Sequence, residues 1–133
     1  MSVKHERGRF GEDYTADFLV NNGYEIVVRN FRKRGGELDI VALKDSELAV
    51  VEVKTRKFGS LTEGIDAITY QKKKNIIQTT AKFLNESEIE FSEMRFDVAE
   101  IVVTTEENPQ VIEFNYYENA FTADGFETIT AWL

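Results

Sequence analysis

Three ionisable residues interrupt two apolar runs of this chain. Asp39 lies in the run 38–43, whereas Glu52 and Lys54 lie in the valine-rich run 48–55. Charged side chains in such runs are usually paired or bind something, because an isolated charge is costly to bury. Alternate residues of a strand face one way, so Glu52 and Lys54 share a face, and a turn at 44–47 would bring Asp39 beside them. The hairpin would then carry a divalent-cation site with an adjacent lysine.

Such a site is suited to the hydrolysis of a phosphodiester. A divalent cation held by carboxylates lowers the pKa of its bound water and screens the charge of the phosphate. Mg²⁺ prefers oxygen ligands and keeps several waters, so Asp39 and Glu52 would suffice, with the Val53 carbonyl as a further ligand. Lys54 would orient the water or stabilise developing negative charge.

The same residues are also compatible with a cross-strand salt-bridge cluster on a solvated sheet face. Other catalytic chemistries have less support. His5, near the N-terminus, is the only histidine, and the absence of cysteine excludes disulfides and thiolate metal sites. The pair Gly35-Gly36 is too short for a dinucleotide fingerprint, and the chain has no P-loop.

Length and composition indicate one globular domain over residues 1–133. The chain is 42% hydrophobic and 12% aromatic, which is enough for a substantial core. No apolar run approaches the roughly 20 residues of a membrane span, and the N-terminal residues lack the apolar centre of a signal peptide. We therefore expect a cytoplasmic protein without a membrane partner.

Charge is distributed unevenly along the chain, although the total is −8. Residues 1–82 carry 15 lysines and arginines against 12 aspartates and glutamates, whereas residues 83–133 carry one against 12. Basic clusters around the hairpin are either solvated faces or phosphate contacts, and their position favours nucleic acid. The candidate nucleic-acid-binding residues are Arg29, Arg32, Lys33, Arg34, Arg56, Lys57, Lys72 and Lys73.

Periodicity and turn signals predict the elements that would position these residues. We expect helices at 4–22, where Gly23 ends the helix, and at 69–85. We expect strands at 24–31, 38–43, 48–55, 95–103 and 111–117, the last at the sheet edge. A basic turn at 32–36, a basic loop at 55–60, a capping box of Ser60 and Glu63 before a short turn at 64–67, and a C-terminal tail at 118–133 complete the chain. The order indicates helices packed on a sheet, in the α/β or α+β class.

Four further polar residues have ordinary explanations by spacing alone. Glu12 is compatible with a first-helix acid favoured by the helix dipole, or with a residue at the edge of a buried face. Gln71 reads as an exposed residue of the second helix. Asp97, on the fourth strand, most simply makes a salt bridge or caps a turn, and Glu37 precedes Asp39 on the same strand.

Motifs around the hairpin carry a resemblance to a known family. Asp39 followed by Glu52-Val53-Lys54 resembles the PD-(D/E)xK nuclease signature. Around it occur, in order, RFGED (9–13), GY (23–24), RNFR (29–32), RGGELDIV (34–41), VEVKTR (51–56) and RFDV (95–98). Together they resemble the YraN family of predicted bacterial endonucleases, which is similar to archaeal Holliday junction resolvases. The likeness covers about residues 7–121 and leaves 122–133 as an extension.

The resemblance implies a restriction-endonuclease-like (tRNA endonuclease-like) fold with a mixed central sheet flanked by helices. It implies that Asp39 and Glu52 bind the metal, joined by Glu12 from the first helix, and that Lys54 is catalytic. It gives Gln71 a supporting catalytic role, whereas Glu37 would add to the site or bind a neighbouring basic residue.

These observations lead to an Mg²⁺- or Mn²⁺-dependent endonuclease acting on DNA, including branched or junction DNA. A homodimer would match the two-fold symmetry of a four-way junction. One alternative is a nucleic-acid-binding module without turnover. Another is an adaptor whose acidic C-terminal third binds a basic partner.

Overall fold

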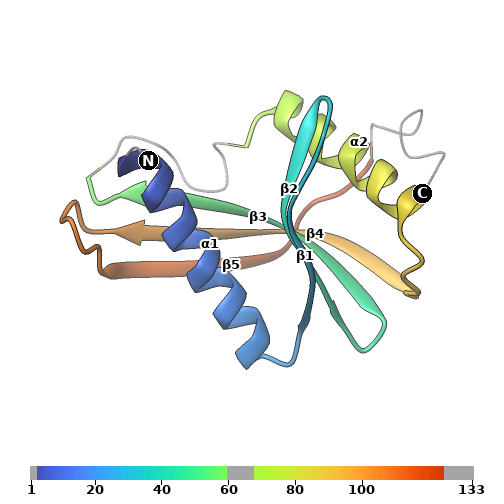
Figure 1. Cartoon of the computed structure of the whole chain (residues 1–133), viewed down its shortest axis with the longest axis horizontal. Helices are drawn as coiled ribbons and strands as arrows, with labels where there is room; N and C mark the ends of the chain where they lie inside the picture. The colour runs from blue at the N-terminus through green and yellow to red at the C-terminus, as the bar shows by residue number, and fades with distance from the viewer. Residues whose placement is uncertain (1–2, 60–67, 125–133) are drawn as a thin grey trace.

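The computed structural model describes residues 3–59 and 68–124, which form helices and strands in the predicted order (Figure 1). The helices are α1 (Val3–Asn21) and α2 (Tyr70–Glu86). The strands are β1 (Glu25–Lys33), β2 (Gly36–Lys44), β3 (Glu47–Lys57), β4 (Glu93–Val103) and β5 (Val111–Phe121).

The five strands form one mixed sheet in the order β1-β2-β3-β4-β5. Neighbouring strands are antiparallel except β3 and β4, which are parallel and are joined through α2. The expected mixed sheet flanked by helices is therefore confirmed, and β5 lies at its edge as predicted.

Each face of the sheet packs against one helix. On one face, Leu19 of α1 lies in a buried cluster with Ile40 and Val51. On the other, Ile77 of α2 packs with Val41 and Val50. Because the central strands are buried on both faces, they are continuously apolar rather than alternating.

The helix ends follow local sequence signals. Gly23, with φ 90°, follows α1 as predicted. Its N–H bonds to the Val20 carbonyl, and the Tyr24 N–H bonds to the Leu19 carbonyl, the two bonds of a Schellman motif. Thr69 caps α2 by accepting a hydrogen bond from the Lys72 N–H at 3.1 Å.

Two hairpins are tighter than the sequence predicts. The turn between β2 and β3 needs only Asp45 and Ser46, both with positive φ, as two-residue hairpin loops require. The expected basic turn at 32–36 is also shorter, because residues 32 and 33 belong to β1 and residue 36 begins β2.

All five strands are longer than predicted, and β3 and β5 extend beyond their predicted C-terminal ends. Residues 55–57, expected in a loop, continue β3, because β4 offers them a parallel partner as far as Val103. Strand β5 extends past residue 117 to Phe121, where Asn119 adopts φ 52° beside a register shift. The expected capping box at Ser60 and Glu63, the turn at 64–67 and the tail from 125 onward lie outside the described residues.

Within residues 3–59 and 68–124, neither helix combines the length and the apolar character that crossing a bilayer requires.

Candidate functional site

The candidate site lies where β2 separates from β3. Backbone pairing of the two strands ends at Ile40 and Val51, and the β1–β2 hairpin then turns away toward α2 (Figure 1). Asp39 directly precedes Ile40 in β2 and so lies just beyond the last backbone pair. Its Oδ2 accepts a hydrogen bond from the Val53 N–H at 2.8 Å. A side chain thus replaces the missing ladder bond and ties the two strands together at their point of divergence.

Asp39 also marks a break in the alternation of β2. Ile40 packs in the cluster under α1, and both Leu38 and Val41 pack in the cluster under α2. Strict alternation would place residues 38 and 40 on the same face. Asp39 therefore lies where β2 changes faces, and residues of both helices, Glu12 of α1 and Lys72 of α2, lie close to the carboxylates there.

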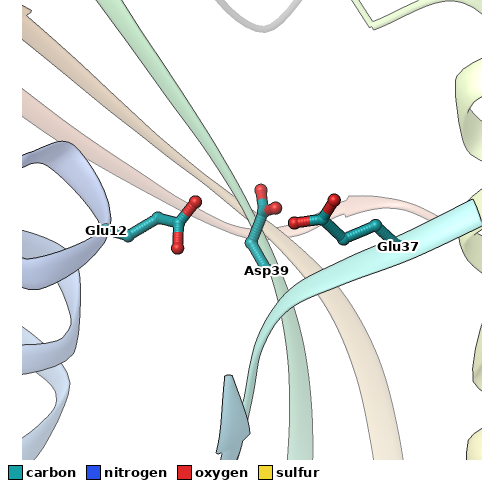
Figure 2. A group of neighbouring side chains, drawn as sticks. All are labelled: Glu12, Glu37 and Asp39. Carbon is teal, nitrogen blue, oxygen red and sulfur yellow. The ribbon is translucent and has the colours of Figure 1, made fainter. Parts of the chain in front are cut away.

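From the α1 side, Glu12 joins the site. One oxygen each of Glu12, Glu37 and Asp39 lie within 4.8 Å of one another. Figure 2 shows the Asp39 carboxylate between the other two, with Glu12 coming from α1 and Glu37 from β2. All three side chains are half-buried.

From the α2 side, Lys72 reaches Glu52. The Lys72 Nζ lies 3.2 Å from the Glu52 Oε1, and Glu52 is only 7% exposed. The carboxyl groups of Glu52 and Asp39 share a hydrogen bond. Asp39 therefore belongs to two groups, one with Glu12 and Glu37 and one with Glu52 and Lys72.

Two glycines allow the helices to come this close. A Cβ on Gly11 would lie 1.7 Å from the Thr55 Oγ1, so α1 rests directly on β3 one residue before Glu12. A Cβ on Gly36 would lie 2.2 Å from the Thr79 Oγ1 and 3.0 Å from the Asn75 carbonyl oxygen of α2. The helix positions on both sides of the site depend on these two contacts.

We expect Gly11→Ala to weaken cation binding by about tenfold, because the added methyl group displaces α1 and withdraws Glu12. The change should leave the free energy of unfolding within about 2 kcal/mol of that of the wild type. Mn²⁺ titration calorimetry measures the first quantity, and urea unfolding measures the second.

Gly8→Ala is the matched control, since its Cβ would meet nothing within 4 Å on the same helix. Adding Thr55→Ala to Gly11→Ala should restore much of the binding by removing the clashing hydroxyl. Equal Mn²⁺ affinity in Gly11→Ala and the wild type would show that Glu12 does not need this contact.

Burial and mutual repulsion raise the pKa of the site carboxyls. Burial, followed by the charge of Asp39, raises the pKa of Glu52 to about 8, against the opposing effect of Lys72. Burial also raises the pKa of Asp39, although the Val53 N–H opposes this. The pKa of Glu12 is raised by burial and then by Asp39. Such crowded carboxyls bind protons more tightly than isolated ones do.

The pKa of Lys72 is also raised, which for a lysine favours the charged form. Burial lowers its pKa, but the charge of Glu52, the hydrogen bond to it and the charges of Asp39 and Glu37 together raise the pKa above its usual value. Lys72 is therefore an ammonium ion in the folded protein, and it is held by the site carboxylates.

Residues 11–101 match the family model described as "Uncharacterised protein family UPF0102". A UPF0102 protein of Prosthecochloris aestuarii is 40% identical over 124 residues, which are 92% of this chain and 98% of the relative. The chain belongs to the UPF0102 family. UPF0102 proteins of Dictyoglomus turgidum and Caldicellulosiruptor bescii are 32% and 39% identical, and their matches cover 97% and 100% of those relatives.

Membership of UPF0102, the YraN family, confirms the resemblance carried by the motifs. The match spans both groups of site residues, from Glu12 to Lys72. The names of these relatives give the family and no activity.

Two predicted catalytic residues of this UPF0102 chain, Lys54 and Gln71, lie on β3 and in α2. Lys54 is half-buried on β3, and its partner in the parallel ladder is Glu100. Gln71, in the first turn of α2, donates to the Asn75 Oδ1 at 2.9 Å, a contact within its own helix. Its role at the site therefore stays a prediction.

Most of the predicted nucleic-acid-binding residues form ion pairs. Arg29 contacts Asp13 at 2.6 Å, Arg32 contacts Glu37 at 3.2 Å, and Lys33 contacts Glu86 at 2.7 Å. A phosphate would have to exchange with these acids.

The remaining basic residues lie in different settings. Arg56 contacts Glu100 at 3.3 Å, and Lys73 lies over the Phe121 ring, 5.7 Å from its centroid. Arg34 accepts a hydrogen bond from Lys82 through its backbone carbonyl, and Lys57 is exposed at the end of β3.

Sequence reasoning did not fully predict how three residues of this chain contact the site. Lys72 was expected to contact phosphate and not a site carboxylate. Glu37 was left between two roles, and the structure supports both, since it pairs with Arg32 and joins Glu12 and Asp39. Asn30, with φ 53° in the middle of β1, hydrogen bonds to Glu12. The RNFR motif contained it, but only the register of β1 reveals its position.

Proposed function

We propose that this protein is a metal-dependent endonuclease that hydrolyses phosphodiester bonds in nucleic acid, with DNA as the expected substrate. The observation that carries the proposal is the position of Asp39, which joins the carboxylates of Glu12 and Glu37 to Glu52 at the divergence of β2 and β3. A purely structural salt-bridge cluster would balance its charges, whereas here four carboxyl groups meet, and the pKa values of Glu12, Asp39 and Glu52 are raised.

The donor set fits a hard divalent cation. Glu12, Glu37 and Asp39 offer carboxylate oxygens within 4.8 Å of one another, and Mg²⁺ and Mn²⁺ favour oxygen ligands. Asp39, Glu52 and Glu12 are the proposed ligands, and Glu37 is a fourth candidate. When bound, such a cation would supply a water of lowered pKa and screen the phosphate charge.

Residues of the chain itself would position the cation, the attacking water and the phosphate. Asp39 accepts a hydrogen bond from the Val53 N–H, which holds its carboxylate beside that of Glu52. Lys54 shares a face with Glu52 by strand alternation and would orient the attacking water or stabilise negative charge on the phosphate. Arg56, on the same strand beyond Lys54, would contact phosphate after exchanging its partner Glu100.

We also propose that the sheet and its two helices form a restriction-endonuclease-like fold. Support comes from the mixed sheet, the parallel pair β3 and β4 joined through α2, and carboxylates placed at the opening of a hairpin. Branched DNA and a homodimer remain part of the proposal on the strength of the resemblance alone.

The proposed function predicts cleavage that requires both a divalent cation and Lys54. Purified protein should cut at least one substrate in a panel of single-stranded, duplex, flap and four-way DNA in Mg²⁺ or Mn²⁺, and should not cut it in EDTA. Lys54→Met should lower the rate by about a hundredfold, as expected for a lost transition-state contact. Gel electrophoresis of end-labelled substrates measures both.

Lys44→Met is the control for loss of one exposed lysine from the same hairpin, and it should cut at the wild-type rate. Salt-dependent binding without cleavage by any divalent cation would favour the alternative, a non-catalytic nucleic-acid-binding module. RNA belongs in the same panel, because the proposed cation and basic residues would contact phosphate, which DNA and RNA share.

A further inference from the structure

We propose that Lys72 and the divalent cation compete for Glu52, so that the lysine occupies the site until the cation binds. This inference rests on the proposed function, and it gives Lys72 a role beyond contact with phosphate. Its basis is the position of one ammonium group, 3.2 Å from the Glu52 Oε1.

The backbone of Lys72 is fixed while its side chain has room to leave. Thr69 caps the first turn of α2 through the Lys72 N–H, and the tight contact of Gly36 with Thr79 and Asn75 sets the distance of the helix from the sheet. The Lys72 side chain is 48% exposed, whereas Glu52 is 7% exposed. Solvent therefore reaches the lysine stem, and the ammonium group can leave while the carboxylate stays.

Occupancy by both cations at once is unfavourable. Glu52 is buried, and its neighbour Asp39 is tied to the Val53 N–H and hydrogen-bonded to Glu52. An ammonium and a divalent cation on the same carboxylate would repel each other at short range in a poorly solvated site. The cation therefore binds to the fraction of molecules in which Lys72 has left, which weakens its apparent affinity.

Substrate would reverse this effect. A phosphodiester in the site offers Lys72 another anionic partner and so favours the form in which Glu52 is free. Since coupling between two ligands is reciprocal, nucleic acid and cation should each tighten the binding of the other. Lys72 thereby makes loading of the cation depend on the presence of substrate.

The test is Lys72→Met, titrated with Mg²⁺ at pH 8.5, where protons compete least for the carboxylates. Loss of one charge-assisted contact should tighten Mg²⁺ binding by about tenfold relative to the wild type. Lys72→Arg should keep the wild-type affinity, because it preserves the competing charge. Lys82→Met, which removes an exposed lysine near the other end of α2, should also leave the affinity unchanged.

A second measurement uses the wild type and does not depend on any variant that fails to fold. Nitrogen-15 NMR of lysine side chains should show a slowly exchanging Lys72 ammonium signal in metal-free protein, and Mg²⁺ should abolish it. A signal that persists at saturating Mg²⁺ overturns the competition.

The outcomes separate this inference from the proposed function. If Asp39→Asn abolishes Mg²⁺ binding but Lys72→Met leaves it unchanged or weaker, the site stands and the competition is wrong. If neither the wild type nor Lys72→Met binds Mg²⁺, both proposals fail.

Discussion

Asp39→Asn should abolish metal-dependent cleavage and at the same time stabilise the metal-free protein. We expect the cleavage rate to fall by about a thousandfold, since a site that supplies several kcal/mol of transition-state stabilisation loses its central ligand. In EDTA at pH 8.5, the free energy of unfolding should rise by on the order of 1 kcal/mol. A residue with a structural role alone would change stability in the opposite direction.

The stabilisation follows from the geometry around Asp39. An asparagine Oδ1 can still accept the hydrogen bond from the Val53 N–H, and its amide can donate to Glu52 without adding charge. Burial and the charge of Asp39 raise the pKa of Glu52 to about 8. Removing one of the two charges therefore relieves a repulsion that the native protein tolerates, as functional sites commonly do.

The pH dependence has a definite sign. The folded protein holds protons on these carboxyls more tightly than the unfolded chain does, so wild-type stability falls as pH rises from the usual carboxyl range, near 4.5, to about 8. The advantage of Asp39→Asn should accordingly be largest at pH 8.5 and vanish below pH 4, roughly where both states are protonated. Urea unfolding across this range measures it.

Asp45→Asn is the matched control, because it makes the same change at the tip of the same hairpin. Its φ of 49° suits asparagine, so neither stability nor cleavage should change appreciably. Added Mg²⁺ should stabilise the wild type and Asp45→Asn but not Asp39→Asn. A loss of stability in Asp39→Asn at every pH would contradict the assignment of Asp39.

The order of elements could be predicted because each has a local signal. Gly23 ends α1, a short polar turn separates β2 from β3, and a helical period identifies α2. The predicted hairpin also brings Asp39 and Glu52 together, because the position of the turn determines which residues of the two strands face each other. The boundaries of β3 and β5 were wrong because they depend on partners from distant parts of the chain.

The arrangement of the site could be predicted only in part. Ile40 packs under α1 whereas Leu38 and Val41 pack under α2, and no residue type predicts this break in alternation at Asp39. Lys72 meets Glu52 only because α2 docks against Gly36, a contact between segments about 40 residues apart.

Charge counts along the chain do not show how the basic residues are paired in the fold. Lys33 pairs with Glu86 and Arg56 pairs with Glu100, so acids from the C-terminal half neutralise bases near the hairpin. The uneven charge of the two halves is thus partly cancelled in three dimensions. A nucleic-acid surface on this face must be assembled from cations that exchange partners, which predicts steep dependence on salt.

Asp97 forms the salt bridge that its sequence context predicted, within a network larger than one pair. Its side chain is fully buried and accepts hydrogen bonds from the Arg95 Nε at 2.9–3.0 Å, from the Tyr116 hydroxyl at 2.6 Å and from the Asn119 N–H at 3.0 Å. Arg95 is 6% exposed and also contacts Glu47 and Tyr24. The network ties β3, β4 and β5 to the segment that follows α1.

Asp97→Asn should therefore destabilise the protein by about 3 kcal/mol, because it leaves the Arg95 guanidinium buried without its central counterion. That loss corresponds to a fall in Tm of about 10 °C for a domain of this size. The pairing with Glu47 keeps the loss at the lower end of the range for broken buried ion pairs. Urea unfolding and thermal unfolding followed by circular dichroism measure the two quantities.

The double variant Arg95→Met with Asp97→Leu separates the cost of an unpaired charge from the worth of the pair. Replacing both partners by apolar groups removes the buried charge, so the double variant should be more stable than Asp97→Asn alone. Arg95 does not depend on Asp97 if Asp97→Asn lowers the free energy of unfolding by less than about 0.5 kcal/mol. The same conclusion follows if the double variant loses as much stability as the single variants Arg95→Met and Asp97→Leu lose together. In that case packing rather than charge holds β4 and β5 together, and the aromatic stack of Phe96 on Phe121 is the next contact to remove.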